Sequence, residues 1–176
     1  WLTPRQTIDL RPTDLDPGFT TYDLAAPDAA WLSRPTTTFG DAVTLLDAGW
    51  LQTGYRPGDI AIMMTAWRVD DPGKAGPLVP PSYTTDAVLF TQVLTPDGQV
   101  LTQQDRLDAP SWGWQAGDVF VQVHELVVPE TAVAGDYRTI IGIYDRSSGA
   151  RLPVTAGDNA GGDTFVRVHP LQITAP

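Results

Sequence analysis

The sequence predicts an all-β protein, namely an antiparallel β-sandwich of the immunoglobulin or fibronectin type with seven to nine short strands. Three observations predict this class. The 176 residues include 16 glycines, 16 prolines and 19 aspartates but only 2 glutamates, a composition that favours turns over helices. Short segments rich in β-branched and aromatic residues recur between turn signals. Helical segments, which a parallel sheet would need between its strands, are not visible.

Residues 1–35 are expected to form an irregular N-terminal arm or linker. Thr7–Arg11 is the only strand candidate there, and Ala25–Leu32 has the composition of one or two helical turns. Prolines interrupt every periodic run in this region, at Pro4, Pro12, Pro17, Pro27 and Pro35. Because the chain starts at Trp1 without a signal peptide, we expect it to be an excised piece of a longer protein.

The predicted sandwich domain covers residues 36–176. Its first half contains three strand candidates, which are Val43–Gln52, Ile60–Val69 and Asp86–Thr95. Both faces of the Ile60–Val69 segment are largely apolar, so the pattern leaves its buried face open. The turn Arg56-Pro57-Gly58-Asp59 separates the first two candidates, and residues 70–82, with four prolines, form a loop.

The second half contains five further candidates, which are Gln99–Arg106, Val119–Val128, Asp136–Tyr144, Arg151–Val154 and Thr164–Ile173. Pro96-Asp97-Gly98 is a tight turn that predicts a hairpin. Valines alternate with polar residues near His124, and Val166 and Val168 alternate with polar residues before His169. Both histidines are therefore placed on the polar faces of their strands. Tyr137, just after a glycine, resembles the tyrosine corner of immunoglobulin-like sandwiches.

Composition also narrows the function. A formal net charge of −10 argues against binding to nucleic acid or to an anionic membrane surface, because both need a basic patch. The absence of cysteine excludes disulfides, a thiol nucleophile and thiolate metal sites. No segment approaches the roughly 20 consecutive apolar residues of a transmembrane helix.

Catalytic signals are weak. None of the five serines lies in a Gly-x-Ser-x-Gly elbow, and two histidines without cysteine make a zinc site unfavourable. Most aspartates lie in turns, where backbone hydrogen bonding explains them. We therefore predict that the chain is not an enzyme by itself. A small hydrolase, including a glycosidase with two carboxylates, is a remote alternative that predicts a deep pocket with a perturbed carboxylate or histidine.

The segment from about Phe39 to Leu171 resembles a bacterial domain that follows the membrane-spanning part of glycosyltransferase-like membrane proteins, whose parents are similar to the dolichyl-phosphate-mannose type of transferase. The matching residues are Phe39-Gly40-Asp41, Tyr55-Arg56-Pro57-Gly58-Asp59, Thr65-Ala66-Trp67, Leu89-Phe90, Thr95-Pro96-Asp97-Gly98, Gln103, Asp105, Trp114-Gln115-Ala116-Gly117-Asp118, His124, Gly135-Asp136-Tyr137, Gly142-Ile143-Tyr144-Asp145 and Arg151-Leu152-Pro153. Residues 1–34 do not match. The resemblance implies a non-catalytic accessory domain outside the cytoplasmic membrane, tethered through its parent protein.

Four residues are candidates for ligand contact. Trp112 and Trp114 lie in a loop, where an exposed indole can stack on a sugar ring. We expect Trp114 to cap the sandwich and Trp112 to be freer. The family pattern associates Asp105 and His124 with Trp114, so Asp105 is a candidate to orient the imidazole. The alternative, which we favour, is a structural hydrogen bond under the loop.

A second candidate site is the glycine-rich loop that contains Asp158, Asn159 and Asp163. These residues offer oxygen ligands for calcium, but their spacing matches no EF-hand, and a mobile surface loop is the favoured interpretation. No other cofactor is expected. The expected partners are the parent membrane domain or a neighbouring protein, and carbohydrate or glycolipid as a candidate ligand. A structural or protein-docking module is the main alternative function, and it predicts an exposed apolar patch.

Overall fold

The computed structural model describes residues 2–8, 19–24, 36–78, 80–81, 83, 85–157, 161 and 163–175. The chain divides into two compact units, Trp1–Arg34 and Pro35–Pro176. In the first unit, β1 (Leu2–Ile8) pairs antiparallel with β2 (Phe19–Leu24). The expectation of an irregular arm is therefore wrong for these two strands. Pro4 does not prevent the pairing because it lies beside a register irregularity, where a strand tolerates proline.

Two other expectations concern this first unit. The predicted Thr7–Arg11 strand overlaps β1 only at its first two residues, and residues 9–11 lie outside the described part of the chain. The Ala25–Leu32 segment, which the sequence offered as helical turns, also lies outside the described residues.

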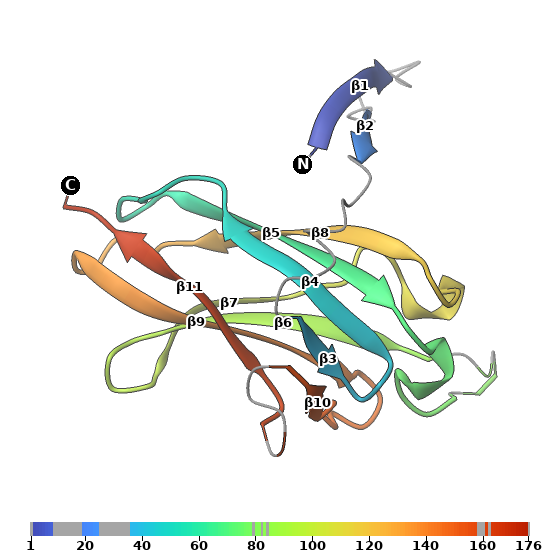
Figure 1. Cartoon of the computed structure of the whole chain (residues 1–176). Helices are drawn as coiled ribbons and strands as arrows, with labels where there is room; N and C mark the ends of the chain where they lie inside the picture. Colours follow the sequence, from blue (N-terminus) through green and yellow to red (C-terminus); the bar gives the residue numbers. More distant parts are fainter. Residues whose placement is uncertain are drawn as a thin grey trace. The chain divides into compact units, whose positions relative to one another are not determined.

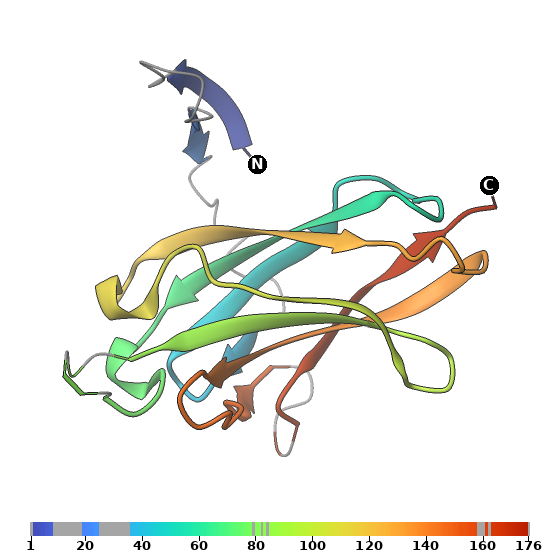
Figure 2. The same cartoon turned by 180° about the vertical axis from the view of Figure 1, so that it is seen from behind.

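The second unit is an antiparallel β-sandwich, as predicted. A five-stranded sheet has the order β10–β3–β4–β5–β8, and a four-stranded sheet has the order β11–β9–β6–β7. The two sheets form two layers in both views (Figures 1 and 2). The strands are β3 (Thr37–Phe39), β4 (Val43–Trp50), β5 (Ile60–Val69), β6 (Ala87–Leu94), β7 (Val100–Asp105), β8 (Val119–Val127), β9 (Gly135–Asp145), β10 (Val154–Ala156) and β11 (Val166–Ile173).

Two single-turn 3₁₀ segments, η1 (Pro72–Lys74) and η2 (Ser111–Gly113), are the only helical elements among the described residues. Within that same part of the chain, no helix is long and apolar enough to cross a membrane.

The segment around Pro153 differs from the expected Arg151–Val154 strand. Arg151 forms an isolated antiparallel bridge to Tyr144, and the Leu152 amide donates to the Ile143 carbonyl, so these residues pair with the end of β9. From Val154 onward the chain pairs instead with β3, in the other sheet. Proline lacks the amide proton that a continuous ladder would use, and it lies where the chain passes from one sheet to the other. β3 itself, with three residues, was too short to be predicted.

The buried face of β8 is the reverse of the predicted one. Val123 and Val127 are 38% and 62% exposed, whereas Gln122 and His124 are fully buried between the sheets. The placement of His124 on a solvent-facing polar side is therefore wrong. Buried polar groups need hydrogen-bond partners, and two threonines supply them for His124, as described below.

The core lies between the two sheets. One cluster is built around Trp67 and Phe39, whose ring centroids are 5.8 Å apart, and a second contains Tyr55, Leu126 and Tyr137. Trp67 is fully buried. Trp50, by contrast, is only half-buried and packs against the margin of both clusters. This position leaves part of its indole available at the surface.

The predicted tyrosine corner is present. The Tyr137 hydroxyl donates to the Val133 carbonyl at 2.8 Å, and the residue is buried. We expect Tyr137→Phe to lower the free energy of unfolding by about 1 kcal/mol, because it removes one hydrogen bond and keeps the ring. Chemical denaturation measures the change. Tyr83→Phe, at an exposed tyrosine, is the matched control, and equal losses in both variants would contradict the structural role of the corner.

Candidate functional site

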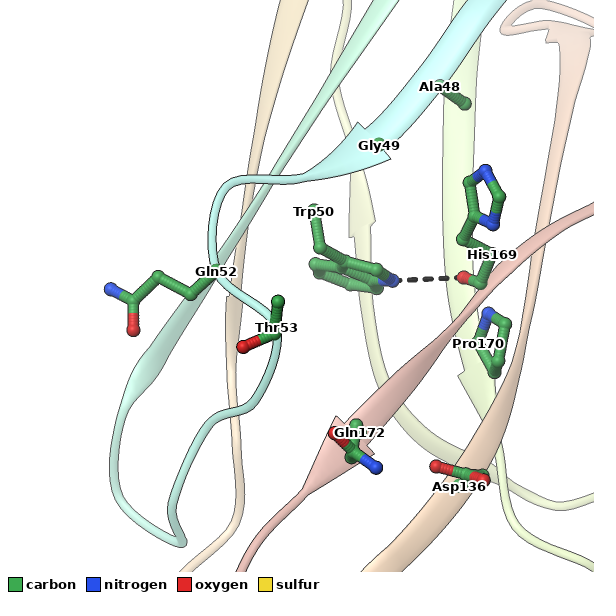
Figure 3. Close-up of a pocket in the computed structure, with 9 residues that line it drawn as sticks. All are labelled: Ala48, Gly49, Trp50, Gln52, Thr53, Asp136, His169, Pro170 and Gln172. Atoms are coloured by element: carbon green, nitrogen blue, oxygen red, sulfur yellow. Dashed lines mark hydrogen bonds between the residues drawn. The ribbon is translucent and has the colours of Figure 1, made fainter.

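An open pocket of about 450 Å³ lies where β4 of one sheet runs beside β11 of the other (Figures 1 and 3). Trp50, at the end of β4, occupies its centre. The polar side chains of the lining are Gln52, Thr53, Asp136, His169 and Gln172. We call this site the Trp50 pocket.

The indole of Trp50 is held in place by two contacts. Its Nε1–H donates to the His169 backbone carbonyl at 2.9 Å, and its ring meets Tyr55 edge-on, with centroids 5.9 Å apart. Tyr55 is in turn buried, and its hydroxyl donates to the Ile62 carbonyl at 3.0 Å. Because the indole N–H is already used, the ring offers a ligand an apolar surface in a fixed position.

A β-bulge brings His169 to the pocket. The β11–β9 register shifts between Val168 and Leu171, so His169 and Pro170 lie outside the regular pairing. Proline is tolerated there because no ladder hydrogen bond is required of it. The bulge places the His169 imidazole beside the indole and points its carbonyl at Nε1 (Figure 3).

The opposite side of the pocket is formed by a cross-strand pair. Gln172 on β11 lies directly opposite Asp136 on β9, and both side chains are exposed at the pocket (Figure 3). Among the described residues of the lining, Asp136 supplies the only carboxylate, and none is a lysine or arginine. The pocket therefore combines one aromatic surface with hydroxyl, amide, imidazole and carboxylate groups, which together donate and accept hydrogen bonds.

The loop that precedes β8 forms a second pocket, of about 360 Å³, beside the two predicted tryptophans. Trp112 is 67% exposed, whereas Trp114 is 9% exposed and stacks on Phe120 with centroids 5.4 Å apart. Trp114 also donates from Nε1 to the Ala109 carbonyl at 2.7 Å. Trp114 thus caps the sandwich, as expected, and Trp112 is the free indole.

This second pocket offers few polar groups. Its lining is otherwise apolar, apart from Asp118. The Asp118 carboxylate accepts a hydrogen bond from the backbone amide of Gln115 at 2.8 Å, within the turn that precedes β8. The η2 loop that lines this pocket lies at the end of the sandwich opposite the loop between β4 and β5 (Figures 1 and 2). None of the four ligand-contact candidates from the sequence lines the Trp50 pocket; these are Asp105, Trp112, Trp114 and His124.

Asp105 does not orient His124. In the register of β6 and β7, Asp105 pairs with Phe90, and its carboxylate accepts a hydrogen bond from the Tyr144 hydroxyl at 3.1 Å. The next residue of β6, Thr91, points to the opposite face and contacts His124. The expected contact between Asp105 and His124 is therefore wrong, because the alternation of the strand puts the two residues on different faces.

His124 belongs to a buried hydrogen-bond chain that joins the two sheets. Trp67 Nε1 donates to Thr65 Oγ1 at 2.7 Å, Thr65 Oγ1 lies 2.9 Å from His124 Nε2, and Thr91 Oγ1 lies 3.0 Å from Nδ1. Burial lowers the pKa of His124 to about 4, and Arg106 also lowers it, whereas Asp108 acts in the opposite direction. A neutral imidazole has one donor and one acceptor, which fits two hydroxyl partners. His124 thus has a structural role through Thr65 and Thr91 and not through the expected Asp105, and its side chain is fully buried.

The calcium hypothesis gains no support from the described residues. Asp158 and Asn159 lie outside them, and Asp163 is exposed. The described part of the chain contains no group of three or more histidine, cysteine, aspartate or glutamate residues placed to hold a metal ion. Calcium binding by this loop stays a prediction.

Four residues of the Trp50 pocket were not predicted as site residues from the sequence, namely Trp50, Asp136, His169 and Gln172. Two signals were present in the sequence. Trp50 lies near the end of the predicted Val43–Gln52 strand, shortly before the polar Gln52 and Thr53. His169-Pro170 interrupts the alternation of the last strand, which is a sign of a bulge. These residues come close only because β4 meets β11. Trp50 and His169, which share a hydrogen bond, are 119 residues apart in the sequence.

Comparison with known proteins adds little. No protein-family model matches the chain, and no curated protein sequence matches it. Among solved structures, the chain is similar to the C-terminal domain of Wzt, with 13% identity, a TM-score of 0.49, and coverage of 81% of this chain and 79% of that one. It is also similar to a calcium-binding mutant of Bacteroides uniformis β-glucuronidase 2, with 13% identity, a TM-score of 0.36, and coverage of 65% of this chain and 13% of that one. Neither similarity assigns a ligand or an activity to this chain.

Proposed function

We propose that the chain is a non-catalytic accessory domain that contacts carbohydrate through the Trp50 pocket. The observation that carries the proposal is the fixed, half-buried indole surrounded by polar side chains. A pyranose ring has an apolar face that an indole can cover, and its hydroxyls need both donors and acceptors. Thr53, His169 and Gln172 provide such groups around the indole, and Asp136 adds an acceptor.

The chemistry of the pocket supports a binding role rather than catalysis. Glycoside hydrolysis commonly needs two carboxylates across the scissile bond, and Asp136 is the single carboxylate among the described lining residues. None of these lining residues is a serine that could act as a nucleophile. The histidine with the strongly lowered pKa, His124, lies in the core and lines neither pocket.

The cellular setting of the proposal comes from the resemblance of residues 39–171 to domains of glycosyltransferase-like membrane proteins. On that basis we place the domain outside the cytoplasmic membrane, carried by a larger membrane protein. Detection of this sequence in the same polypeptide as membrane-spanning segments, with its residues accessible to protease from the extracytoplasmic side, would support this placement. Accessibility only from the cytoplasmic side would contradict it.

Trp50→Ala is expected to weaken glycan binding by at least about tenfold, because the apolar surface of the site is removed. Binding is measured on a glycan array and then by calorimetry with a positive glycan. His169→Ala tests the same pocket with an exposed side chain whose loss does not open the core. Trp112→Ala, at the exposed indole of the other pocket, is the matched control and should bind normally.

The opposite pattern, in which Trp112→Ala abolishes binding and Trp50→Ala retains it, would move the site to the η2 loop. No glycan binding by the wild-type chain would contradict the proposed function itself. Thermal melting of each variant separates a lost site from a lost fold.

One observation favours a second candidate function, docking to a protein. The outward face of β5 and β8 carries exposed apolar side chains, among them Ile60 at 57% and Val127 at 62% exposure. These two residues lie opposite each other in the strand register. A docking role predicts that Val127→Asp abolishes capture of the parent protein and leaves glycan binding unchanged.

A further inference from the structure

We infer that the Trp50 pocket accepts neutral sugars and excludes acidic ones, and that Asp136 is the residue that sets this specificity. The inference rests on the proposed function, since it concerns the ligand class of the same pocket. Three features support it: the position of Asp136, its lack of a partner within the described residues, and the absence of lysine and arginine from the described lining.

Asp136 lies inside the reach of a bound ligand. The residue is the second of β9, and it faces Gln172 across the β9–β11 ladder at the edge of the pocket (Figure 3). Directly opposed residues of an antiparallel pair have Cβ atoms about 4.5–5.5 Å apart. A sugar that rests on the indole therefore meets a carboxylate and an amide side by side.

The charge of Asp136 is not compensated. Within the described part of the chain, its carboxylate makes no hydrogen bond and no ion pair. Arg138 lies two positions further along the same face of β9, but it forms no ion pair with Asp136 and does not line the pocket. Among the described lining residues, a ligand therefore meets one acidic side chain and no basic one, on a chain whose net charge is −10.

This arrangement discriminates by charge. An unpaired carboxylate is a strong acceptor for the hydroxyl groups of a neutral sugar, because hydrogen bonds to a charged acceptor are the stronger kind. The carboxylate of a uronic acid, or a sugar phosphate, would instead approach a like charge, and none of the described lining residues is an arginine or lysine that would offset the repulsion. The chemical class that fits is a neutral hexopyranoside.

The test uses matched sugar pairs. A glycan array that holds both neutral and uronate-containing glycans first finds the configuration that binds. Calorimetry at pH 8 and low salt then compares the methyl hexopyranoside of that configuration with its uronate, which differs only at C6. We expect the wild-type chain to bind the uronate at least about tenfold more weakly than the neutral sugar.

Asp136→Asn should reduce this difference to less than about threefold, because asparagine keeps the shape and an acceptor but removes the charge. Glu125→Gln, which makes the same change of charge at an exposed position of the other sheet, should leave the difference unchanged. The wild-type discrimination should also shrink in high salt, since the effect is electrostatic.

Equal binding of the two sugars by the wild-type chain would overturn the inference and leave the proposed function intact. A difference that persists in Asp136→Asn would overturn the assignment to this residue. If no glycan of either kind binds, the proposed function fails, and the inference fails with it. These outcomes can be distinguished because binding of the neutral sugar tests whether the pocket binds carbohydrate, whereas the weaker binding of the uronate tests the effect of the Asp136 charge.

Discussion

Acidification from pH 7 to pH 4 is expected to cost the fold about 3 kcal/mol through His124 alone. Burial lowers the pKa of this imidazole from 6.5 to about 4 in the folded chain. Between these values the unfolded chain binds a proton that the folded chain does not, so stability rises with pH. The contribution is fully present above the unfolded pKa and is lost as pH falls towards the folded value.

His124→Gln separates this effect from the general protonation of carboxylates, which both proteins share. Glutamine offers a donor and an acceptor but does not titrate, so the variant should lose about 3 kcal/mol less than the wild type between pH 7 and pH 4. Urea denaturation at several pH values measures the two slopes. His169→Gln, at the exposed histidine of β11, should retain the steep wild-type dependence because His124 is still present.

Parallel pH curves for the wild type and His124→Gln would contradict this account of the buried imidazole. We expect the variant to be less stable at pH 7, since it repacks a site between Thr65 and Thr91. That offset does not affect the comparison, which depends on the slopes.

Trp114→Ala is expected to lower the free energy of unfolding by about 3–5 kcal/mol, and Trp112→Ala by no more than about 0.5 kcal/mol. The two tryptophans are separated by one residue, but Trp114 is buried against Phe120 and donates to the Ala109 carbonyl, whereas Trp112 projects into solvent. Removing Trp114 leaves a cavity at the end of the core. Removing Trp112 leaves none.

Chemical denaturation of both variants measures the contrast, and Trp112→Ala is the control for a change in the same loop. Trp114→Phe divides the effect further, because it keeps an aromatic ring against Phe120 but loses the indole hydrogen bond and the volume of the second ring. We expect it to cost about 1–3 kcal/mol, less than Trp114→Ala. Similar losses for Trp112→Ala and Trp114→Ala would show that the loop does not cap the sandwich in this way.

The local features of the fold could be predicted from the sequence. Ile60–Val69 has the same bounds as β5, and the Pro96-Asp97-Gly98 turn joins β6 and β7 in a hairpin. The Tyr137 corner also forms as expected. Each of these features depends on residues close together in the chain: a run of β-formers, a turn with preset backbone angles, or a tyrosine four residues from its partner.

The sequence by itself thus determined that this chain makes short antiparallel strands that stack into a sandwich. Only the tertiary structure decided which face each strand buries and which side chains meet. The alternation of β8 is compatible with either face, and the threonines on β5 and β6 that satisfy His124 settled it. The Trp50 pocket likewise requires β4 to meet a bulge in β11. Register and the meeting of distant strands depend on contacts far apart in the chain, which no local pattern encodes.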